Sequence, residues 1–540
     1  MILTIKNKGV DILVTVPGKY IHDIRKQFPN ITEADVSRLY EKAYKEIYRR
    51  IVELSEIEHI DCASILQSSH MMNEINDSIL NLTFSYIQFE QDRQMYSGQY
   101  QHIFDFVEQE QLSDTFFEQS VTEGHPFHPM TKTKLGLSVN DVIQYSPEFR
   151  NSVKIIPILC DHTLVQSIHS DIDIREHHLS SINTKVQDYC ESHALQFESY
   201  DLLFIHEWQY AHFMYPQFKS LFDEQRLIPL HHLAVESHPL LSFRTLDVDA
   251  FDCIVKTAVN VQATSAVRNV SPASIHNGIR LSHLVEDIYR NKSYSNSYIQ
   301  KDLSGSFLNV DDAHANKCSY MLRERIPQSK DRHQLVCGSL ITTSFISQQP
   351  ILIECIEIIQ SKEGLSFDKA AIQFLTAYAE QLLSSTYRLM LEEGISLEGH
   401  MQNSTVIIKD GMPEGFYMRD FGGVRLFESD VDIDASTGLL TDDFEDLLSV
   451  FSHAVLYNHL FQLIRVLDQH GYDADKGYDI VRQVIASYHK QITPEMNILE
   501  QPTFRIKSLL KMRIQAEGYD YQYSEIKNPL FKEVHTYELD

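Results

Sequence analysis

Residues 398–425, EGHMQNSTVIIKDGMPEGFYMRDFGGVR, have the pattern of a β-hairpin. The run Ser404–Lys409 is rich in β-branched residues, Asp410-Gly411 is a typical turn pair, and residues 415–419 return through two aromatic side chains. Strand-forming runs on either side of an Asp-Gly pair are a strong local hairpin signal. The stretch therefore predicts two antiparallel strands whose free ends lie side by side.

Two oxygen-bearing side chains flank this hairpin, Asn403 before the first strand and Asp420 after the second. Strand pairing brings the amide oxygen and the carboxylate into one small volume, with His400 nearby as a further donor. Proteins commonly hold Mg²⁺ with one or two side-chain oxygens together with phosphate oxygens, so this pair is a candidate site for a nucleotide-bound magnesium ion. The alternative is an ordinary hairpin in which Asp420 closes a turn before Gly422-Gly423.

The order His, Asn, strand, strand, Asp-Phe-Gly also occurs in the metal-binding half of protein kinases. A kinase needs a catalytic Asp shortly after the His, whereas Met401, Gln402 and Asn403 follow His400. The expected base for phosphoryl transfer to a hydroxyl is therefore missing. A kinase-like phosphotransferase stays as an alternative, and release of ADP rather than AMP would identify it.

The length and composition indicate a globular protein of several domains. A chain of 540 residues exceeds the size at which one core keeps growing, so two or three domains are expected. We find no uninterrupted apolar stretch long enough to cross a bilayer, and residues 1–8 lack the apolar region of a signal peptide, which predicts a cytoplasmic protein. The seven cysteines are scattered without a C-x-x-C pair, which argues against a zinc ribbon, an iron–sulfur site or a disulfide framework.

The chain is strongly acidic. Its 47 Lys and Arg against 75 Asp and Glu give a formal net charge of -28. This charge repels nucleic acid and anionic membranes, so we expect neither as a partner. A site for anionic small molecules then requires a local cluster of Lys and Arg whose positive charge offsets the negative potential of the whole chain.

The N-terminal part, to about residue 120, is predicted to be mostly helical and to serve as a scaffold or dimer surface. A long helix over residues 32–59 begins with a capping-box-like spacing between Thr32 and Asp35. Further helices are expected over residues 73–91 and 99–112.

Residues 123–136, EGHPFHPMTKTKLG, gather two imidazoles and two ammonium groups beside prolines that fix the backbone. His125 and His128 could share a metal ion, but no third ligand stands at zinc spacing, so anion binding or simple loop rigidity is favoured. Lys132 and Lys134 are two residues apart, which in a strand points both side chains the same way. They could therefore contact one phosphate or carboxylate.

From residue 151 the pattern alternates between strands and helices, which indicates an α+β region. Residues 153–160 and 201–205 predict strands, and residues 172–193 predict a helix. The second strand runs into His206-Glu207-Trp208-Gln209, where the single Trp of the chain is expected to pack in a core.

A basic cluster follows over residues 242–268. The motif SFRT, residues 242–245, precedes a predicted strand over residues 252–264. A face that carries Lys256 beside Arg244 and Arg268 is either solvated or holds an anion, and in a chain this acidic the whole set favours phosphate binding. From a side-chain period of two, the residues expected on one face of the strand are Lys256, Asn260, Gln262 and Thr264.

The remaining segments are predicted from composition and periodicity. Residues 290–306 are rich in Ser, Asn and Lys and predict a mobile loop. Neither G-x-x-x-x-G-K-[ST] nor G-x-G-x-x-G occurs, so a nucleotide site cannot be of the P-loop or Rossmann type. Helices are expected over residues 366–393, 441–470 and 478–489, and a last basic segment over residues 505–513.

Together these motifs resemble the IucA/IucC siderophore synthetases, over residues 123–530. The resemblance rests on EGHPFHPMTKTKLG, on SFRT with the following Lys256, Thr264 and Arg268, on the hairpin GHMQN to RDFGG, and on the closing KSLLKMR and NPL. It implies an enzyme that uses ATP and Mg²⁺ to adenylate a carboxylate, typically of citrate or a citryl derivative. The acyl group would then pass to an amine or hydroxyl, with release of AMP and pyrophosphate.

The resemblance also implies a fold, an assembly and site residues. The fold is an α+β cupped hand, often dimeric, with a helical thumb at 1–120, mixed α/β fingers at 121–345 and a kinase-like palm at 346–540. Lys134 and Glu207 stand where the family usually has Arg and Pro, and Lys cannot make the bidentate contacts of Arg. The catalytic residues would be Arg244, Lys256, Arg268 and His400. The metal ligands would be Asn403 and Asp420. ATP would contact Ser242, Arg244, Thr245, Lys256, Thr264, Arg268, His125, Lys132, Glu398, His400, Asn403 and Asp420.

A further alternative is a ferric-siderophore reductase or an iron-binding protein, because the C-terminal part of this family resembles ferric reductase proteins. No cysteine follows Cys355, so the ligands of an iron–sulfur cluster are missing from that region. The sequence leaves the identity of the carboxylate, of the nucleophile and of the siderophore open.

Overall fold

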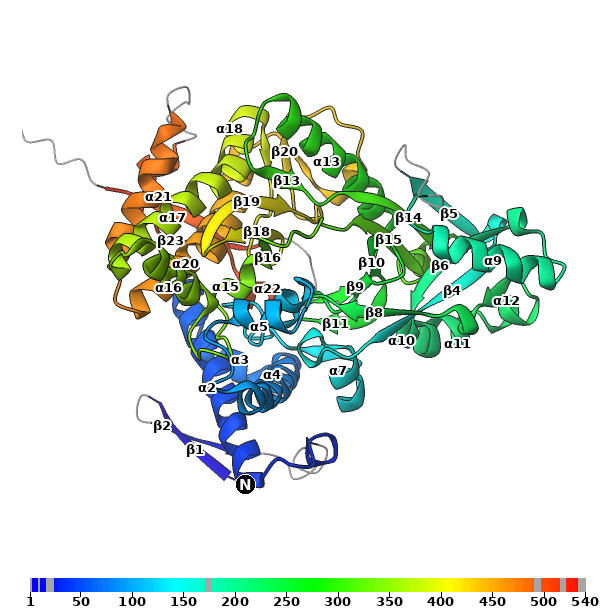
Figure 1. The fold of residues 1–540 in the computed structure, drawn as a ribbon, viewed down its shortest axis with the longest axis horizontal. Coiled ribbons are helices and arrows are strands. Elements are labelled where there is room, and N and C mark those ends of the chain that lie inside the picture. The colour runs from blue at the N-terminus through cyan, green and yellow to red at the C-terminus, as the bar shows by residue number, and fades with distance from the viewer. Residues whose placement is uncertain are drawn as a thin grey trace, which may run out of the picture.

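The protein has a mixed α/β fold, with helices at the N-terminus, a large sheet, and a smaller sheet surrounded by helices (Figure 1). Buried apolar side chains of the described residues form three large clusters, one in each of these parts. The structure is a computed structural model and describes residues 2–7, 10–15, 24–169, 177–489, 497–514 and 521–532.

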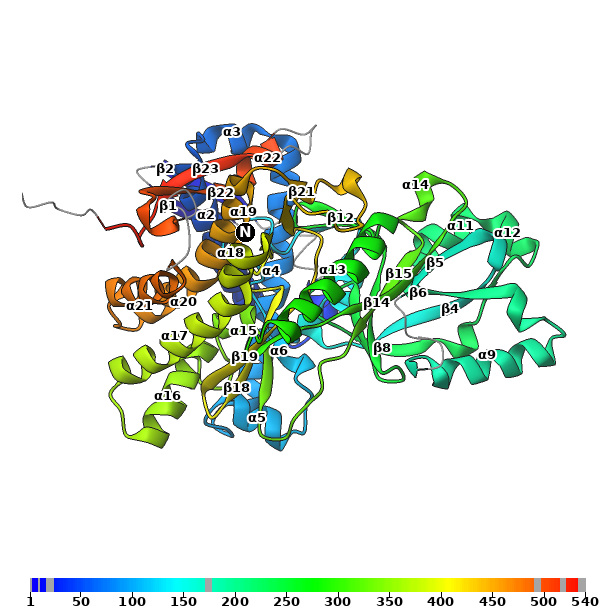
Figure 2. The ribbon, with the colours of Figure 1, turned by 90° about the horizontal axis from the view of Figure 1, so that it is seen from above.

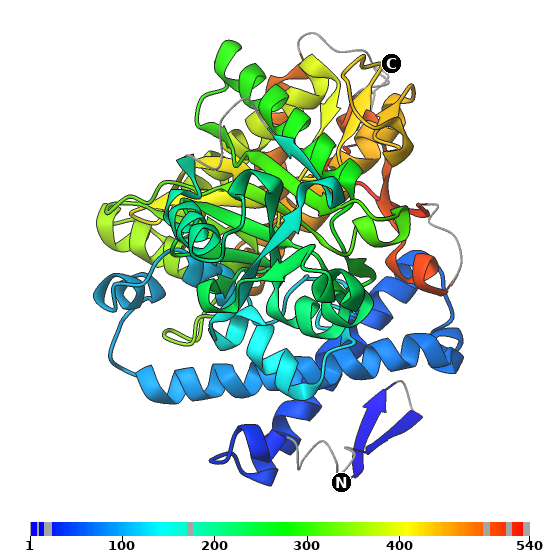
Figure 3. The same cartoon turned by 90° about the vertical axis from the view of Figure 1, so that its right-hand side faces the viewer.

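The N-terminal part is built on two long helices, α2 (Glu33–Glu58) and α4 (Ser69–Tyr96), joined by α3 (Cys62–Gln67). The Thr32 hydroxyl accepts a hydrogen bond from the Asp35 N–H at 3.1 Å, which confirms the predicted start of the first helix. Figure 3 shows α4 running along the base of the molecule. Strands β1 (Ile2–Asn7) and β2 (Val10–Thr15) pair as a separate hairpin.

The large sheet has nine strands, and all of its pairs are antiparallel. Helix α9 (Ser180–Ser192) packs on one face through Ile182 and Val186, and α13 (Pro272–Asn291) packs on the other through Ile275 and Ile279 (Figure 2). In spatial order the strands are β5 (Val165–His169), β14 (Asp302–Leu308), β15 (Ser319–Glu324), β10 (Cys253–Thr257), β9 (Thr245–Val248), β8 (Val235–Pro239), β4 (Val153–Asp161) and β6 (Tyr200–His206), with β7 (Leu227–Pro229) also paired to β4.

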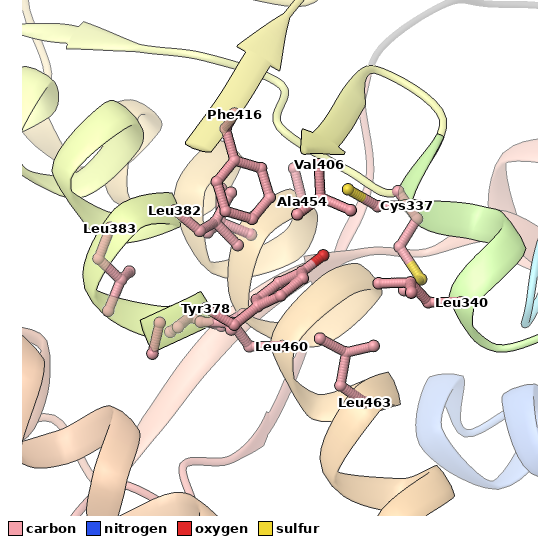
Figure 4. Close-up of a cluster of buried hydrophobic side chains, with 14 of the residues drawn as sticks. Cys337, Leu340, Tyr378, Leu382, Leu383, Val406, Phe416, Ala454, Leu460 and Leu463 are labelled. Carbon is pink, nitrogen blue, oxygen red and sulfur yellow. The ribbon is translucent and has the colours of Figure 1, made fainter. Parts of the chain in front are cut away.

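The smaller sheet contains the predicted hairpin. Strands β18 (Ser404–Lys409) and β19 (Met412–Met418) pair antiparallel around Asp410-Gly411, as expected. They are flanked by β16 (His333–Val336) and by β13 (Ser297–Ile299), which runs parallel to β19. Phe416 and Val406 of the hairpin pack against Tyr378 of α17 in the buried apolar core (Figure 4). The hairpin is therefore a central part of a sheet rather than an exposed ribbon.

Helices enclose this sheet. One continuous helical run, Phe444–Gln469, is long and apolar enough to cross a bilayer, contrary to expectation, but 94% of its most apolar window is buried inside the protein. It is a core helix of the fold. The helices are α16 (Ile351–Glu363), α17 (Phe367–Leu383), α18 (Leu389–Glu393), α19 (Phe444–Phe451), α20 (Phe461–Gln469) and α21 (Ala474–Ser487), with π-helical turns at Ser384–Arg388 and Ser452–Leu460.

Two sequence predictions in the middle of the chain are wrong. The strand predicted over residues 252–264 is interrupted at Ala258. There the N–H groups of Thr257 and Ala258 still bond to the Arg244 and Ser319 carbonyls near the start of β9 and of β15, and the chain then leaves the large sheet. The second half of the predicted strand becomes β11 (Val259–Ala263), which pairs in another sheet. The four polar residues expected on one face therefore do not share one strand.

The mobile loop predicted over residues 290–306 is also wrong, because this segment supplies β13 and the start of β14. The polar side chains of these two strands are buried, some of them against partners distant in sequence. Ser297 accepts a hydrogen bond from Ser385 at 2.8 Å, and Ser306 lies 2.8 Å from Ser167, oxygen to oxygen.

The short elements complete the description. Helices α5 (Ile103–Gln109) and α6 (Thr115–Gln119) pack into the cluster of the smaller sheet. The first residues of the helix predicted over 172–193 lie outside the described residues. The other short elements are β3 (Lys134–Leu135), α7 (Val139–Tyr145), α10 (Glu207–Gln209), α11 (Tyr215–Gln217), α12 (Lys219–Asp223), β12 (Ala266–Arg268), α14 (Asp312–Ala315), α15 (Cys337–Leu340), β17 (Ile395–Ser396), β20 (Arg425–Phe427), β21 (Leu440–Thr441), β22 (Thr503–Lys507), α22 (Leu509–Ile514) and β23 (Tyr523–Lys527).

Candidate functional site

The large sheet meets the open end of the hairpin at one ion pair. Lys256 Nζ on β10 lies 2.7 Å from Asp420 Oδ2, just after β19. Burial lowers the pKa of Lys256 to about 8, against the attraction of Asp420. Burial would raise the pKa of Asp420, but Lys256 and the nearby Arg323 hold it well below its usual range. Two segments that are far apart in the sequence are thus joined at the predicted site.

Two arginines surround the same carboxylate. Burial and the neighbouring Arg268 lower the pKa of Arg244 to about 9, and burial lowers the pKa of Arg268 against the attraction of Asp420. Arg244 Nη1 donates to the Asn269 carbonyl at 2.7 Å, and its buried Nε has no partner within the described chain. Cations with lowered pKa values around a single carboxylate have an excess of positive charge, which an added anion would stabilise.

The polar residues of the basic cluster lie on the same elements. Thr245 on β9 is directly opposite Lys256 on β10, and the Thr245 N–H closes a turn onto the Ser242 carbonyl at 2.7 Å. Thr264 follows β11 with φ 59°, a left-handed conformation that is rare for a β-branched residue. Its N–H donates to the Thr133 carbonyl at 3.0 Å, which ties it to the end of the EGHPFHPMTKTKLG segment.

The open end of the hairpin places Asn403 beside Asp420. The Arg419 N–H donates to the Asn403 carbonyl at 3.0 Å, which closes the hairpin immediately before Asp420. Asn403 Nδ2 donates to the Glu398 carbonyl at 3.2 Å, so the amide oxygen is the end left for a cation. The Asp420 side chain remains 36% exposed. These two oxygen donors suit Mg²⁺ only together with further oxygens such as those of phosphate.

No group of three or more His, Cys, Asp or Glu side chains within the described ranges is arranged to hold a metal ion. A metal at Asn403 and Asp420 would therefore depend on the substrate for most of its ligands. His125 and His128 likewise have no third His, Cys, Asp or Glu ligand among the described residues. Their Nδ1 atoms accept backbone N–H groups of their own loop.

A second ion pair lies beside the hairpin. Lys507 Nζ on β22 lies 2.6 Å from Glu398 Oε1. Burial would raise the pKa of Glu398, but Lys507 and His400 lower it to about 2. A methyl group on Gly423 would come within 2.0 Å of Glu398 Oε2, so this glycine leaves room for the carboxylate. Sequence reasoning noted a basic segment at Lys507 but did not place it at the hairpin.

Several imidazoles of this region are neutral. Burial lowers the pKa of His400, against the attraction of Glu398. Burial, with His128, His400 and His453 as further causes, lowers the pKa of His125 far below its usual value. Burial lowers the pKa of His453 to about 3. His125 is thus within electrostatic reach of His400, as a shared site requires.

Lys132 is paired within the protein. Its Nζ lies 3.0 Å from Glu148 Oε1, and both side chains are buried, so its charge is already neutralised within the protein. Only Lys134 lies in a strand, β3, and the Lys134 N–H donates to Asp77 at 2.7 Å. Burial would raise the pKa of Glu148, but Lys132 and Lys134 lower it to about 2. The two lysines therefore act on one carboxylate, as expected, and that carboxylate belongs to the protein itself.

Two segments of the chain, the first central and the second C-terminal, each match a family model. Residues 113–342 match the IucA/IucC family, and residues 372–522 match the ferric iron reductase FhuF-like transporter family. The first match contains Lys256 and both arginines, and the second contains the hairpin. No cysteine occurs in residues 372–522, which leaves that segment without thiolate ligands.

Relatives and solved structures agree with the first match. The chain is 29% identical to staphyloferrin A synthase of Staphylococcus aureus, over 87% of this chain and 81% of that protein. It is 26% identical to D-ornithine–citrate ligase of the same species, over 86% and 77%. Its fold matches ATP-bound aerobactin synthetase IucA of Klebsiella pneumoniae with a TM-score of 0.73 at 19% identity, over 90% of this chain and 87% of that one.

Proposed function

Because the chain belongs to the IucA/IucC family, through the match over residues 113–342, we propose that it is an ATP-dependent siderophore synthetase. It adenylates a carboxylate of citrate, or of a citryl derivative or related polycarboxylic acid, and condenses it with an amine or hydroxyl. The amide or ester forms with release of AMP and pyrophosphate. The name of one relative, D-ornithine–citrate ligase, supports citrate as the leading acid.

The observation that carries this proposal is the contact between Lys256 and Asp420. It places a cluster of cations with lowered pKa values against a pair of oxygen donors at the end of the hairpin. Adenylation needs both, because negative charge develops on the α-phosphorus and on the leaving pyrophosphate. A solvated surface would not hold three such cations around one carboxylate.

In the first step a substrate carboxylate oxygen attacks the α-phosphorus of ATP, and pyrophosphate leaves. Arg244, Lys256 and Arg268 would bind the phosphates, with Ser242, Thr245 and Thr264 as hydroxyl donors. Asn403 and Asp420 would hold Mg²⁺, which supplies charge neutralisation when it is bound. Burial lowers the pKa of His400, which favours the neutral imidazole, and its ring would hydrogen-bond the α-phosphate.

In the second step a neutral amine or hydroxyl attacks the acyl carbon of the mixed anhydride, and AMP leaves. No covalent enzyme intermediate is required, so the protein contributes mainly proximity and exclusion of water. Three side chains within electrostatic reach of His400 would orient polar groups of the substrates: Glu398, its partner Lys507, and His125.

The assembly follows the family resemblance. We propose a cupped hand with a thumb at 1–120, fingers at 121–345 and a palm at 346–540, working as a cytoplasmic homodimer. Nucleic acid and membrane are not proposed as partners, in view of the net charge of -28.

The test is a substrate panel in which pyrophosphate, AMP and ADP are measured separately. We expect AMP and pyrophosphate only with Mg²⁺ and a polycarboxylic acid, with citrate and D-ornithine as the first pair. Steady ADP formation would favour the kinase-like alternative. Pyrophosphate release that no acid and amine in the panel changes would overturn the proposal.

A further inference from the structure

A buried ion pair lies directly behind the candidate site. Arg419 Nη1 and Nη2 lie 2.5 Å and 2.9 Å from Glu118 Oε1 and Oε2, a bidentate contact. Glu118 is on α6 and Arg419 is at the end of β19, 301 residues later. Arg419 is 8% exposed and Glu118 is 9% exposed. A planar fork of this kind fixes the geometry of both partners.

The pair also holds the backbone of two site segments. Glu118 Oε2 accepts the Leu241 N–H at 3.0 Å, immediately before Ser242. Arg419 Nε and Nη2 donate to the Gln402 carbonyl at 3.2 Å and 2.9 Å, immediately before Asn403.

Arg419 itself is the residue before Asp420. Glu118 and Arg419 therefore hold the residue that directly precedes each of three site residues, which are Ser242, Asn403 and Asp420. The Glu118 carboxylate and the Arg419 guanidinium each have several hydrogen-bond partners. A buried charge needs such partners, because an unpaired one destabilises the fold.

We propose that Glu118 and Arg419 are positioning residues that set the loop at Ser242, the side chain of Asn403 and the carboxylate of Asp420 in one geometry. The role in adenylation rests on the proposed function, whereas the mechanical role does not. Loss of the fork would loosen the three segments together, and a misplacement of about 1 Å can cost about 100-fold in rate.

The test compares two conservative variants with a matched control. Arg419→Lys keeps the charge but loses the fork, and Glu118→Gln keeps the shape but loses the charge. Arg150→Lys is the control, because Arg150 Nη2 lies 2.6 Å and 2.7 Å from both oxygens of Asp92, in a half-buried pair that touches no site segment.

Amide hydrogen exchange of the protein alone gives the first readout. In both site variants we expect the amides of Leu241 and Arg419 to exchange about tenfold faster, a change that corresponds to about 1.4 kcal/mol in local opening. The control should leave these amides unchanged. Unchanged exchange in the site variants would overturn the proposal, whatever the protein catalyses.

Steady-state kinetics give the second readout. We expect kcat to fall about 100-fold and the Mg²⁺ requirement to rise in both site variants, at melting temperatures close to that of the control. Kinetics that match those of Arg150→Lys would overturn a positioning role in catalysis. If the wild-type protein forms no AMP, the proposed function fails, and the exchange experiment still decides whether the pair positions the three segments.

Discussion

Lys256 Nζ and Asp420 Oδ2 lie 2.7 Å apart, and this contact joins the large sheet to the end of the hairpin. Under the proposed function, Lys256 and Asp420 would each exchange this partner for a group of the bound nucleotide or its metal ion. The ammonium can turn to a phosphate and the carboxylate to a metal ion without either being left buried and unpaired. The pair thus keeps both groups ionised and in place before the substrate arrives.

Asp420→Asn tests the metal role. Asp420 has φ 67°, and Asn tolerates this left-handed conformation as Asp does, so the turn should survive. We expect the variant to fold, to lose about 100-fold or more in rate, and to need far more Mg²⁺ for the remainder, because the charge that offsets the metal is gone. A magnesium titration beside a thermal melt measures both effects.

The control for this variant is Asp410→Asn at the closed end of the same hairpin. Asp410 has φ 52°, so this substitution also places Asn in a left-handed conformation, but away from the site. It should leave rate and magnesium dependence as in the wild type. An unchanged magnesium dependence in Asp420→Asn would remove Asp420 from the metal site.

Much of the hairpin could be predicted because its signals are local. The Asp410-Gly411 turn and the β-branched run are enough to specify the two strands, and pairing then places Asn403 near Asp420. Trp208 in a core was likewise predicted from its residue type and is confirmed. A strand can be predicted from the sequence where the residues that specify it lie close together in the chain.

The failures have non-local causes. Residues 290–306 have the composition of a loop, yet Asp302 is buried because Arg323 on the next strand donates to it at 2.7 Å. Lys132 was predicted to face an anion, and the anion that it faces is Glu148 of the protein itself. Sequence shows neither partner, because only the folded chain brings them together.

Gly423→Ala tests the Glu398–Lys507 pair. The added methyl group would lie 2.0 Å from Glu398 Oε2, so the carboxylate must move and its 2.6 Å contact with Lys507 is broken. Because the end of this side chain is flexible, we expect little loss of thermal stability but a drop of about tenfold or more in kcat/KM for the acid. The matched control is Gly422→Ala, whose methyl group would lie 3.6 Å from Asp420 Oδ1, an ordinary contact. Equal kinetics in the two variants would show that the position of Glu398 does not matter.

His333→Gln tests a pH-dependent contact outside the site. His333 on β16 lies 3.2 Å from Asp114 and 3.3 Å from Glu108, with Phe104 and Phe117 packed on its ring. Burial would lower the pKa of His333, but the two carboxylates raise it above 6.5. A raised pKa stabilises the fold below the unfolded value and loses that contribution as the pH rises through the folded value.

Thermal melts should therefore show His333→Gln below the wild type by about 1 °C at pH 6, if the contact contributes about 1 kcal/mol, and closer to it at pH 9. His314→Gln serves as a control, because its ring also contacts two phenylalanines, Phe213 and Phe218, whereas its only carboxylate partner among the described residues, Asp311, lies within the same short helix end. A difference that stays constant with pH would show that the charge of His333 contributes nothing.

Substitutions of Thr264 distinguish its effect on the stability of the fold from its effect on ATP binding. A β-branched residue at φ 59° costs about 1–2 kcal/mol relative to right-handed backbone, and such strain is often retained at functional sites. Asn adopts this conformation more readily, so Thr264→Asn should raise the melting temperature. If the hydroxyl binds a phosphate of ATP, the same variant should lose about tenfold in kcat/KM for ATP, whereas Thr264→Ser keeps the hydroxyl and should retain most of the rate. Melting curves and ATP titrations of both variants provide the measurement. A Thr264→Asn protein that is both more stable and fully active would show that the Thr264 hydroxyl has no part in binding the nucleotide.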